Sequence, residues 1–221
     1  MPPTLRAWSV FATGGMASSS WPCASVTMFP MEPDRPRSHL RRIEGRNHAR
    51  SLTFSCFGNR PFLRSERACT WLVDGIRAAG ERYAIDIWAW IAMPTHVHLL
   101  VYPRTRSQRI GPVLATIKLH VARRAVRWME AHHPGGLDRM RDVQPSGRVS
   151  LRFWQRGGGY DRNLVSPEAI VSEVRYIHQN PVRAGLCMRA EEWKWSSIHE
   201  HLRPGAGPIA VQRASLLASI R

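Results

Sequence analysis

The stretch MPTHVHLLVYPR, residues 93–104, decides the predicted fold because it joins a turn to a strong β-strand pattern. Val, Tyr and other β-branched or aromatic residues favour strands, and successive side chains on a strand point to opposite faces. His96 and His98 therefore lie on one face with Cα atoms roughly 6.5–7 Å apart, so both rings can reach one metal ion. Histidines in strands are more often ordinary packed or surface residues, so the pair alone is weak evidence for a metal site.

The segments around this strand predict an α+β fold. The expected elements are a strand at 51–57, a helix carrying 69–79, a strand at 84–91, the His96 strand, a helix at 112–128, a loop at 133–147 and a strand at 149–154. The order β-α-β-β-α-β is that of a ferredoxin-like antiparallel sheet with its helices on one face. In that topology the first and third strands are central. The histidines are thus expected on a central strand, on the face that the two helices leave uncovered.

A further C-terminal helix is predicted after the sheet. Ser166 suits the N-cap position, and Pro167 suits the first helical position. Tyr176 and Asn180 are four residues apart, so they share one face of this helix. The Asn180-Pro181 pair is expected to end it.

The composition points to a polyanionic partner. The 221 residues carry 32 Lys plus Arg against 16 Asp plus Glu, a formal net charge of +16. Such a field attracts nucleic acid, and Arg supplies forked donors for phosphate groups. The helix at 112–128 also places basic residues away from its apolar stripe. The residues that we expect to contact phosphate are Arg41, Arg42, Arg46, Lys118, Arg123, Arg124 and Arg127.

The domain organisation follows from where periodic patterns begin and end. Residues 1–46 are rich in Ser, Pro and Met without a sustained period, so we expect a disordered basic tail or a mis-annotated start. Residues 47–202 form the predicted domain, and residues 203–221 the predicted C-terminal tail. Trp88 and Trp90 are two residues apart on the 84–91 strand, so both are expected on the same face, in the core.

Cysteine usage and hydropathy favour a cytoplasmic protein. The four cysteines form no C-x-x-C pair, which indicates thiols in a reducing compartment. No stretch is apolar for the length that a membrane span requires. We expect no membrane partner.

Together, the two histidines, Tyr176 and Asn180 form a coherent set for breaking a phosphodiester bond. A metal ion can polarise a phosphate oxygen, a nucleophile can attack phosphorus, and an amide oxygen can complete a site for Mg²⁺ or Mn²⁺. Each part taken alone has an ordinary structural explanation. Tyrosines commonly lie at the boundary of a core with a solvated hydroxyl, and an Asn before Pro commonly terminates a helix.

At these residues the sequence resembles the REP-associated tyrosine transposases, a branch of the HUH single-strand transposase and nuclease superfamily. The residues MPTHVHLLVYPR look like the family's H-U-H strand, with Val97 as the apolar residue between the histidines. Three further segments look like family motifs, in order along the chain: FWQRGGGYDR (153–162), RYIHQNPVRAGL (175–186) and WKWSS (193–197). The resemblance runs from roughly residue 51 to 200, although the three glycines of the second segment are more than the family leads us to expect.

The resemblance implies a role for each site residue. His96 and His98 become metal ligands and Asn180 the third ligand, with Mg²⁺ or Mn²⁺ as the ion. Tyr176 becomes the nucleophile that forms a 5′-phosphotyrosine and releases a 3′-hydroxyl, which lets the enzyme rejoin strands without ATP. The implied partner is single-stranded DNA with hairpins, such as repetitive extragenic palindromes. The resemblance implies a monomer, with a dimer as the alternative. It also implies a cytoplasmic protein that associates with the nucleoid.

Three alternatives stay open at the level of sequence. Tyr160 is a rival nucleophile, although it lacks an amide one helical turn further on. A zinc hydrolase could use the H-x-H pair, although Leu100 stands where a third histidine of the histidine-triad kind would be. A hairpin-binding regulator without cleavage could retain every one of these residues.

Overall fold

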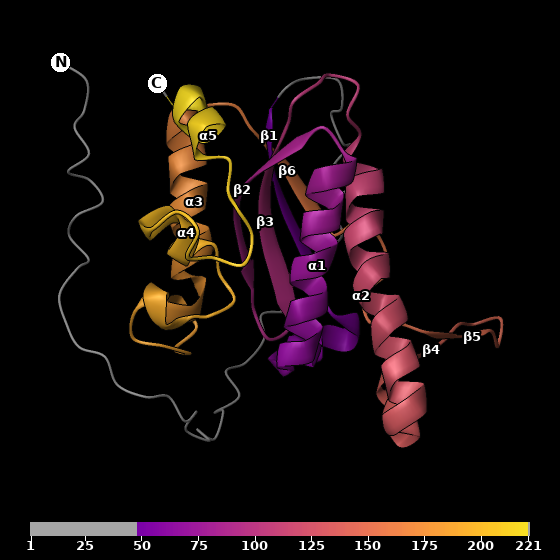
Figure 1. Cartoon of the computed structure of the whole chain (residues 1–221). Helices are drawn as coiled ribbons and strands as arrows, with labels where there is room; N and C mark the ends of the chain where they lie inside the picture. The colour runs from indigo at the N-terminus through magenta and orange to yellow at the C-terminus, as the bar shows by residue number, and fades with distance from the viewer. Residues whose placement is uncertain (1–47, 221) are drawn as a thin grey trace, which may run out of the picture. The chain divides into compact units, whose positions relative to one another are not determined.

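The computed structural model of the protein describes residues 48–220, and its centre is a four-stranded antiparallel sheet in the order β2-β3-β1-β6 (Figure 1). The strands are β1 (Ala49–Ser55), β2 (Ile85–Ala92), β3 (His96–Pro103) and β6 (Tyr160–Leu164). The helices α1 (Glu66–Arg82) and α2 (Ile110–His132) connect them in the order β1-α1-β2-β3-α2-β6. The ferredoxin-like prediction is confirmed, and β3 is a central strand.

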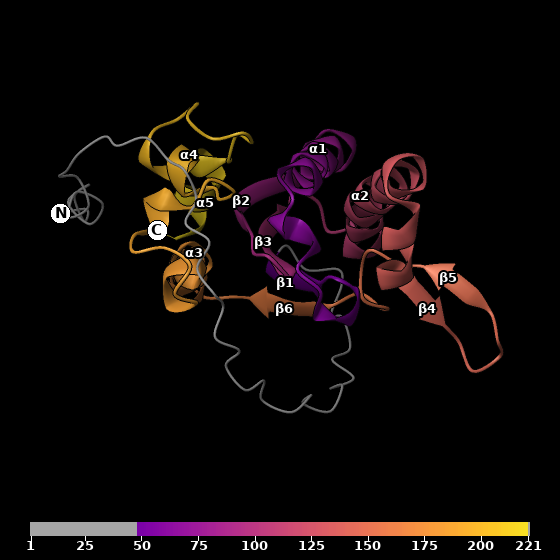
Figure 2. The same cartoon turned by 90° about the horizontal axis from the view of Figure 1, so that it is seen from below.

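The sheet has a core on each face. Alternation along β3 sends Val97, Leu99 and Val101 towards α1 and α2, where they join the larger apolar cluster. Leu100, on the other face, belongs to a second cluster that includes residues of α3 (Pro167–Arg183). Figures 1 and 2 show α1 and α2 on one side of the sheet and α3 on the other. The sheet face opposite α1 and α2 is therefore the face that bears His98.

The prediction of the last sheet strand is wrong. Residues Val149–Leu151 form β5, which pairs only with β4 (Arg141–Val143) in a separate hairpin that projects beside α2 (Figure 2). The fourth sheet strand is β6, whose sequence YDRNL lacks an apolar alternation because it is a largely exposed edge strand. Its register is fixed by a bidentate ion pair between the buried side chains of Arg50 and Asp161, 2.7 Å apart. A pattern of apolar residues could not reveal a strand held by charge.

Gly159 explains part of the glycine-rich segment before β6. Its φ is +77°, a left-handed conformation that favours glycine. A Cβ at this position would collide with the carbonyl oxygen of Thr53 on β1. The third glycine is thus required for β6 to approach β1.

The two tryptophans of β2 lie on opposite faces, contrary to the prediction. The pairing of β2 with β3 shifts between Ile87 and Ala89, so Trp88 is an extra residue in a bulge. Trp88 packs in the cluster with α3, and Trp90 packs in the cluster with α1 and α2. Both side chains are fully buried.

Helix α3 begins as predicted and ends later. The Ser166 hydroxyl accepts a hydrogen bond from the Ala169 backbone amide at 3.2 Å. Pro181 lies inside the helix, which continues to Arg183. A proline so close to the end of a helix removes only one hydrogen bond. Gly185 follows the end of the helix, and its φ of +67° suits the left-handed position there.

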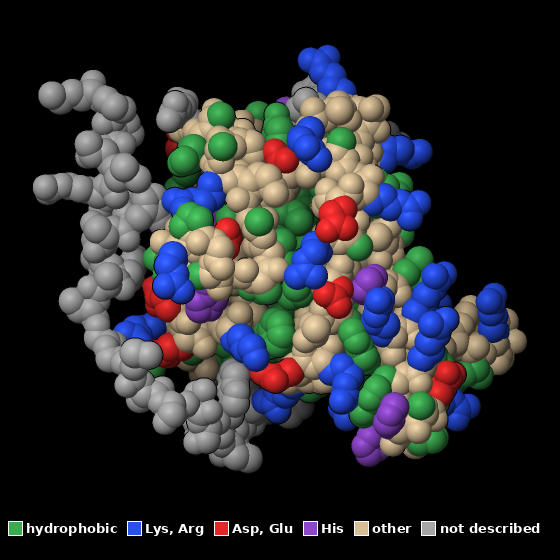
Figure 3. Space-filling model, viewed as in Figure 1, with side chains coloured by type: hydrophobic (Ala, Val, Ile, Leu, Met, Phe, Trp, Pro, Cys, Tyr) green, Lys and Arg blue, Asp and Glu red, His purple; other side chains and the backbone are tan. Residues whose placement is uncertain are grey.

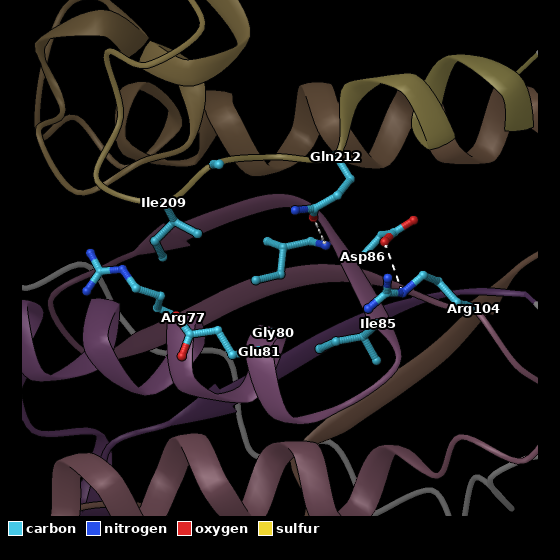
Figure 4. A pocket seen from close by; sticks show the side chains of 10 residues that line it. Arg77, Gly80, Glu81, Ile85, Asp86, Arg104, Ile209 and Gln212 are labelled. Atoms are coloured by element: carbon cyan, nitrogen blue, oxygen red, sulfur yellow. Dashed lines mark hydrogen bonds and ion pairs between the residues drawn. The ribbon is translucent and has the colours of Figure 1, made fainter.

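The C-terminal segment contributes to both cores. Residues 203–221 were predicted as a tail; up to residue 220 they include α5 (Arg213–Ser219) and follow α4 (Ile198–Leu202). Ile209 belongs to the larger cluster and Leu216 to the smaller one. Gln212 lies along the edge of β2, where its side-chain oxygen accepts a bond of 2.6 Å from the Ile87 amide (Figure 4). The cavity of about 310 Å³ beside it is lined by both acidic and basic side chains, so it does not select a charged ligand.

The remaining short elements are 3-10 turns. They are η2 (Phe57–Asn59), η3 (Phe62–Arg64), η4 (Pro134–Met140) and η5 (Ala190–Glu192). No helix within residues 48–220 has the length and apolar character to cross a bilayer. The predicted boundary at residue 46 and the candidate residues Arg41, Arg42 and Arg46 lie outside the described residues.

Candidate active site

The two histidines of β3 converge as the sequence predicts. The Nε2 atoms of His96 and His98 lie 3.1 Å apart. Two nitrogens bound at about 2.0–2.1 Å to one ion, at right angles or somewhat wider, are themselves about 3 Å apart. The pair therefore has the spacing of two ligands to one metal ion.

The other ring nitrogens are held by threonine hydroxyls. Nδ1 of His98 lies 2.8 Å from Oγ1 of Thr53 on β1, and Nδ1 of His96 lies 3.0 Å from Oγ1 of Thr95. When Nδ1 carries the proton and donates to the hydroxyl, Nε2 presents its lone pair to a metal ion. Sequence analysis missed both threonines. Thr95 adjoins the histidine pair, but Thr53 can be assigned only once the register of β1 against β3 is known.

Burial keeps both histidines neutral. It lowers the pKa of His98, with a smaller effect from His96, to about 3, and burial also lowers the pKa of His96. Neutral imidazole is the form that binds metal ions. The pair is thus ready to bind a metal at neutral pH without first losing protons.

Tyr176 on α3 lies directly beside the histidine pair. Its ring centroid is 5.4 Å from that of His98, with the rings nearly perpendicular. The Arg183 guanidinium lies 5.3 Å from the centroid of the same ring. Tyr176 remains 39% exposed, so a substrate can reach it. The structure therefore brings together the predicted nucleophile, the two predicted histidine ligands and a cation.

Asn180 lies one helical turn beyond Tyr176. Two contacts show how α3 runs along β3. Glu173 accepts a hydrogen bond from Ser51, which pairs with Leu100 of β3. Tyr176 contacts His98, which lies two residues before Leu100. Helix α3 therefore runs towards the start of β3, and Asn180 follows Tyr176 in that direction. The Asn180 Nδ2 donates to the Tyr176 carbonyl at 3.2 Å, so Oδ1 is the amide atom that could bind a metal ion.

A third ligand for the histidine pair would have to differ from the types that are usual for zinc. Within residues 48–220, no group of three His, Cys, Asp or Glu side chains is placed to hold a metal ion. Structural and catalytic zinc sites usually take three or four ligands of those types. To complete a metal site, the histidine pair would therefore need a ligand of another type, such as the amide oxygen of Asn180.

Tyr160 is on the same face as the histidines but further away. Thr53 pairs with His98 on one side and with Tyr160 on the other, and directly paired residues point to the same face. Tyr160 is thus two strands from His98, about 9.6 Å across the sheet. Its side chain is 46% exposed. Distance favours Tyr176, although both tyrosines face the site.

Buried polar contacts fix α3 on the sheet. Glu173 accepts hydrogen bonds from Ser51, at 2.6 Å, and from Arg162, at 2.8 Å. On the far side of the helix, His178 Nε2 lies 2.8 Å from Oγ of Ser197, which also accepts from the Trp90 amide at 2.9 Å. These contacts hold the helix that carries Tyr176. They give the WKWSS segment a structural role.

The polar sequence around α4 contains a buried histidine. His201 lies in a polar stretch of sequence, yet it is 7% exposed and its Nε2 lies 2.7 Å from the Trp88 carbonyl oxygen. Burial is the main cause that lowers the pKa of His201. A histidine in a polar sequence context can be buried when a distant carbonyl is its partner.

The predicted phosphate-binding residues of α2 fall into two groups. Lys118 Nζ donates to the Gly157 carbonyl at 2.9 Å, so its ammonium group holds the loop before β6. Arg123, Arg124 and Arg127 are exposed on the opposite side of the sheet from the histidines. The structure therefore does not bring them into the histidine site.

Comparison with known proteins gives one sequence relative and a matching fold. No protein-family model matches the chain. A provisionally named REP-associated tyrosine transposase of Haemophilus influenzae is 23% identical over 123 residues, which cover 56% of this chain and 64% of the relative. The fold matches a solved structure of the REP-associated tyrosine transposase bound to a REP hairpin. The TM-score is 0.58 and the sequence identity is 19%. The match covers 76% of this chain and 87% of that chain. The chain has the fold of a REP-associated tyrosine transposase.

A second solved structure, of a provisionally named transposase from Deinococcus radiodurans, covers 60% of this chain and 88% of that one at 19% identity. Its TM-score is 0.38, too low to support an argument. The resemblance predicted from the four sequence motifs is confirmed by the relative and by the fold.

Proposed function

We propose that the protein is a metal-dependent single-strand DNA endonuclease and strand transferase, a transposase that acts beside DNA hairpins. The observation that carries this proposal is the position of Tyr176 against His98, where two Nε2 atoms 3.1 Å apart converge. A nucleophile beside a metal-binding pair is the arrangement that phosphodiester cleavage requires. The fold match and the name of the H. influenzae relative support the same class of protein.

The residues divide the work of cleavage. His96, His98 and Asn180 would hold Mg²⁺ or Mn²⁺, which supplies charge to polarise a non-bridging phosphate oxygen. The Tyr176 oxygen loses its proton and attacks phosphorus, so a bond forms between Tyr176 and the 5′-phosphate. The bond from phosphorus to the 3′-oxygen breaks, and that oxygen takes up a proton to leave as a 3′-hydroxyl. Attack by another 3′-hydroxyl on the phosphotyrosine reverses the step and joins two strands.

The proposed substrate is single-stranded DNA that carries hairpins. The solved structure with the same fold is described as bound to a REP hairpin, which supports repetitive extragenic palindromes as the class of target. We propose that the protein works as a monomer on DNA in the cytoplasm, at the nucleoid.

A covalent adduct tests this proposal. Incubate the full chain with labelled hairpin-bearing oligonucleotides and Mn²⁺, and look for a protein–DNA adduct on a denaturing gel. Tyr176→Phe and His96→Ala should abolish the adduct, whereas Tyr160→Phe should retain it. Loss of the adduct in Tyr160→Phe alone would assign the nucleophile to Tyr160. Hairpin binding without any adduct would instead support a regulator that binds DNA without cleaving it.

A further inference from the structure

A basic hollow lies between α1 and α2, on the side of the sheet away from the histidines. Its volume is about 470 Å³. We call it the α1–α2 groove. It is lined by Arg82, Thr116, Leu119, His120, Arg123, Arg124 and Arg127. Figure 3 shows Lys and Arg side chains gathered over α2 on this face.

The arginines of the α1–α2 groove have no carboxylate partner within the described residues. No carboxylate lines the groove, and none of its four arginines forms an ion pair among residues 48–220. On α1 itself, by contrast, Arg77 is paired with Asp74 at 3.1 Å. Several like charges around one hollow repel each other, so their free energy falls when an anion enters.

Close packing of the two helices sets the shape of the groove. A Cβ on Gly75 would lie 3.2 Å from Cβ of His120, so glycine lets α1 and α2 approach closely there. Tyr83 and Thr116 are joined through their hydroxyls at 3.0 Å near the end of α1. From Thr116 to Arg127, α2 rises about 16 Å, an axial length over which one strand of a duplex carries about five phosphates.

We propose that the α1–α2 groove binds the phosphate backbone of a duplex DNA stem. This inference rests on the proposed function for its choice of DNA hairpins as the partner. Single-strand binding surfaces combine positive charge with aromatic side chains on which bases stack. The lining of the groove includes four arginines and Leu119, but no Phe, Tyr or Trp. It therefore suits phosphates, which position a duplex, rather than unstacked bases.

The α1–α2 groove is separate from the histidine site. The groove and the histidine pair lie on opposite sides of the sheet, so binding of the stem and cleavage of the strand use separate residues. Changes in the groove should weaken binding of hairpins and leave the chemistry on a hairpin-free strand intact. Substitutions in the groove therefore test stem binding, and substitutions at the histidine site test cleavage.

The test measures affinity by fluorescence anisotropy between 50 and 300 mM salt, with a labelled hairpin and with an unstructured strand of equal length. The change is Arg123→Gln with Arg127→Gln. Each phosphate contact on a duplex contributes about 0.9 to the slope of log affinity against log salt. The slope for the hairpin should therefore fall by about 1.8, and affinity at 0.1 M salt by up to about 60-fold. Affinity for the unstructured strand should change little.

Two matched variants serve as controls. Arg77→Gln with Asp74→Asn removes an exposed ion pair of α1 and leaves the net charge unchanged, so the salt slope should not change. Arg123→Lys with Arg127→Lys keeps both charges, so it should keep the slope even if side-chain shape matters for folding.

An unchanged slope in the double Gln variant would overturn the inference, as would an equal loss of affinity for both DNAs. Failure of the proposed function would show differently. No adduct would then form with any DNA, while the groove substitutions would still weaken hairpin binding.

Discussion

Removing the hydroxyl of Ser197 should destabilise the protein strongly. Ser197 is fully buried, and its Oγ accepts from the Trp90 amide at 2.9 Å and contacts His178 Nε2 at 2.8 Å. Ser197→Ala leaves both of these buried groups without this partner. Each unsatisfied buried polar group costs about 1–3 kcal/mol, so the free energy of unfolding should fall by about 2–6 kcal/mol. That is a large part of the total stability of a typical domain, about 5–15 kcal/mol.

Urea-induced unfolding followed by Trp fluorescence measures this change, with the slope m checked for constancy. Ser196→Ala is the matched control, because Ser196 is equally buried and its Oγ accepts one bond, from the Ile198 amide at 3.2 Å. It should cost about 1 kcal/mol. If the two variants lose the same stability, Ser197 does not link α3 to the sheet as the structure indicates.

Three further results are expected. Gly159→Ala should destabilise the fold by more than about 2 kcal/mol in urea unfolding, because its Cβ meets the Thr53 carbonyl. Gly157→Ala should cost only about 1 kcal/mol, because Gly157 has a similar φ of +87° but nothing within 4 Å of its Cβ. Equal losses of stability in the two variants would refute the clash. The unfolded chain binds protons near pH 6.5, whereas buried His98 and His178 each have a pKa of about 3. The free energy of unfolding should therefore fall as pH decreases from 6.5 to 3, by up to about 1.4 kcal/mol per unit for each of the two histidines, and a flat profile would contradict their burial. His96→Ala should weaken Mn²⁺ binding in calorimetry by at least about 10-fold while hairpin affinity is kept; unchanged Mn²⁺ affinity would remove His96 from the site.

Local patterns in the sequence predicted the elements that define the site. The alternation around His96 and His98 is a property of any strand, and the spacing of Tyr176 and Asn180 is a property of any helix. The order of elements then placed the pair on a central strand. These inferences need no knowledge of which distant residues meet.

Other features depend on pairing between distant segments, which no local pattern contains. The bulge at Trp88 reverses the faces of two tryptophans, and only the register of β2 against β3 reveals it. β6 is held by the Arg50–Asp161 ion pair, so its polar sequence gave no strand signal. Thr53 and Ser197 act on the site through bonds to residues 45 and 19 positions away. Sequence therefore indicated which candidate residues lie together better than which residues hold them in place.

Mass spectrometry of the protein–DNA adduct tests the central claim most directly. After reaction with a hairpin-bearing strand and Mn²⁺, the adduct is digested with nuclease and protease, and the peptide that carries the nucleotide is sequenced. The account predicts a 5′-phosphonucleotide on Tyr176, whose ring lies 5.4 Å from His98, and a free 3′-hydroxyl on the released DNA. A nucleotide on Tyr160, or cleavage without any tyrosine adduct, would contradict it.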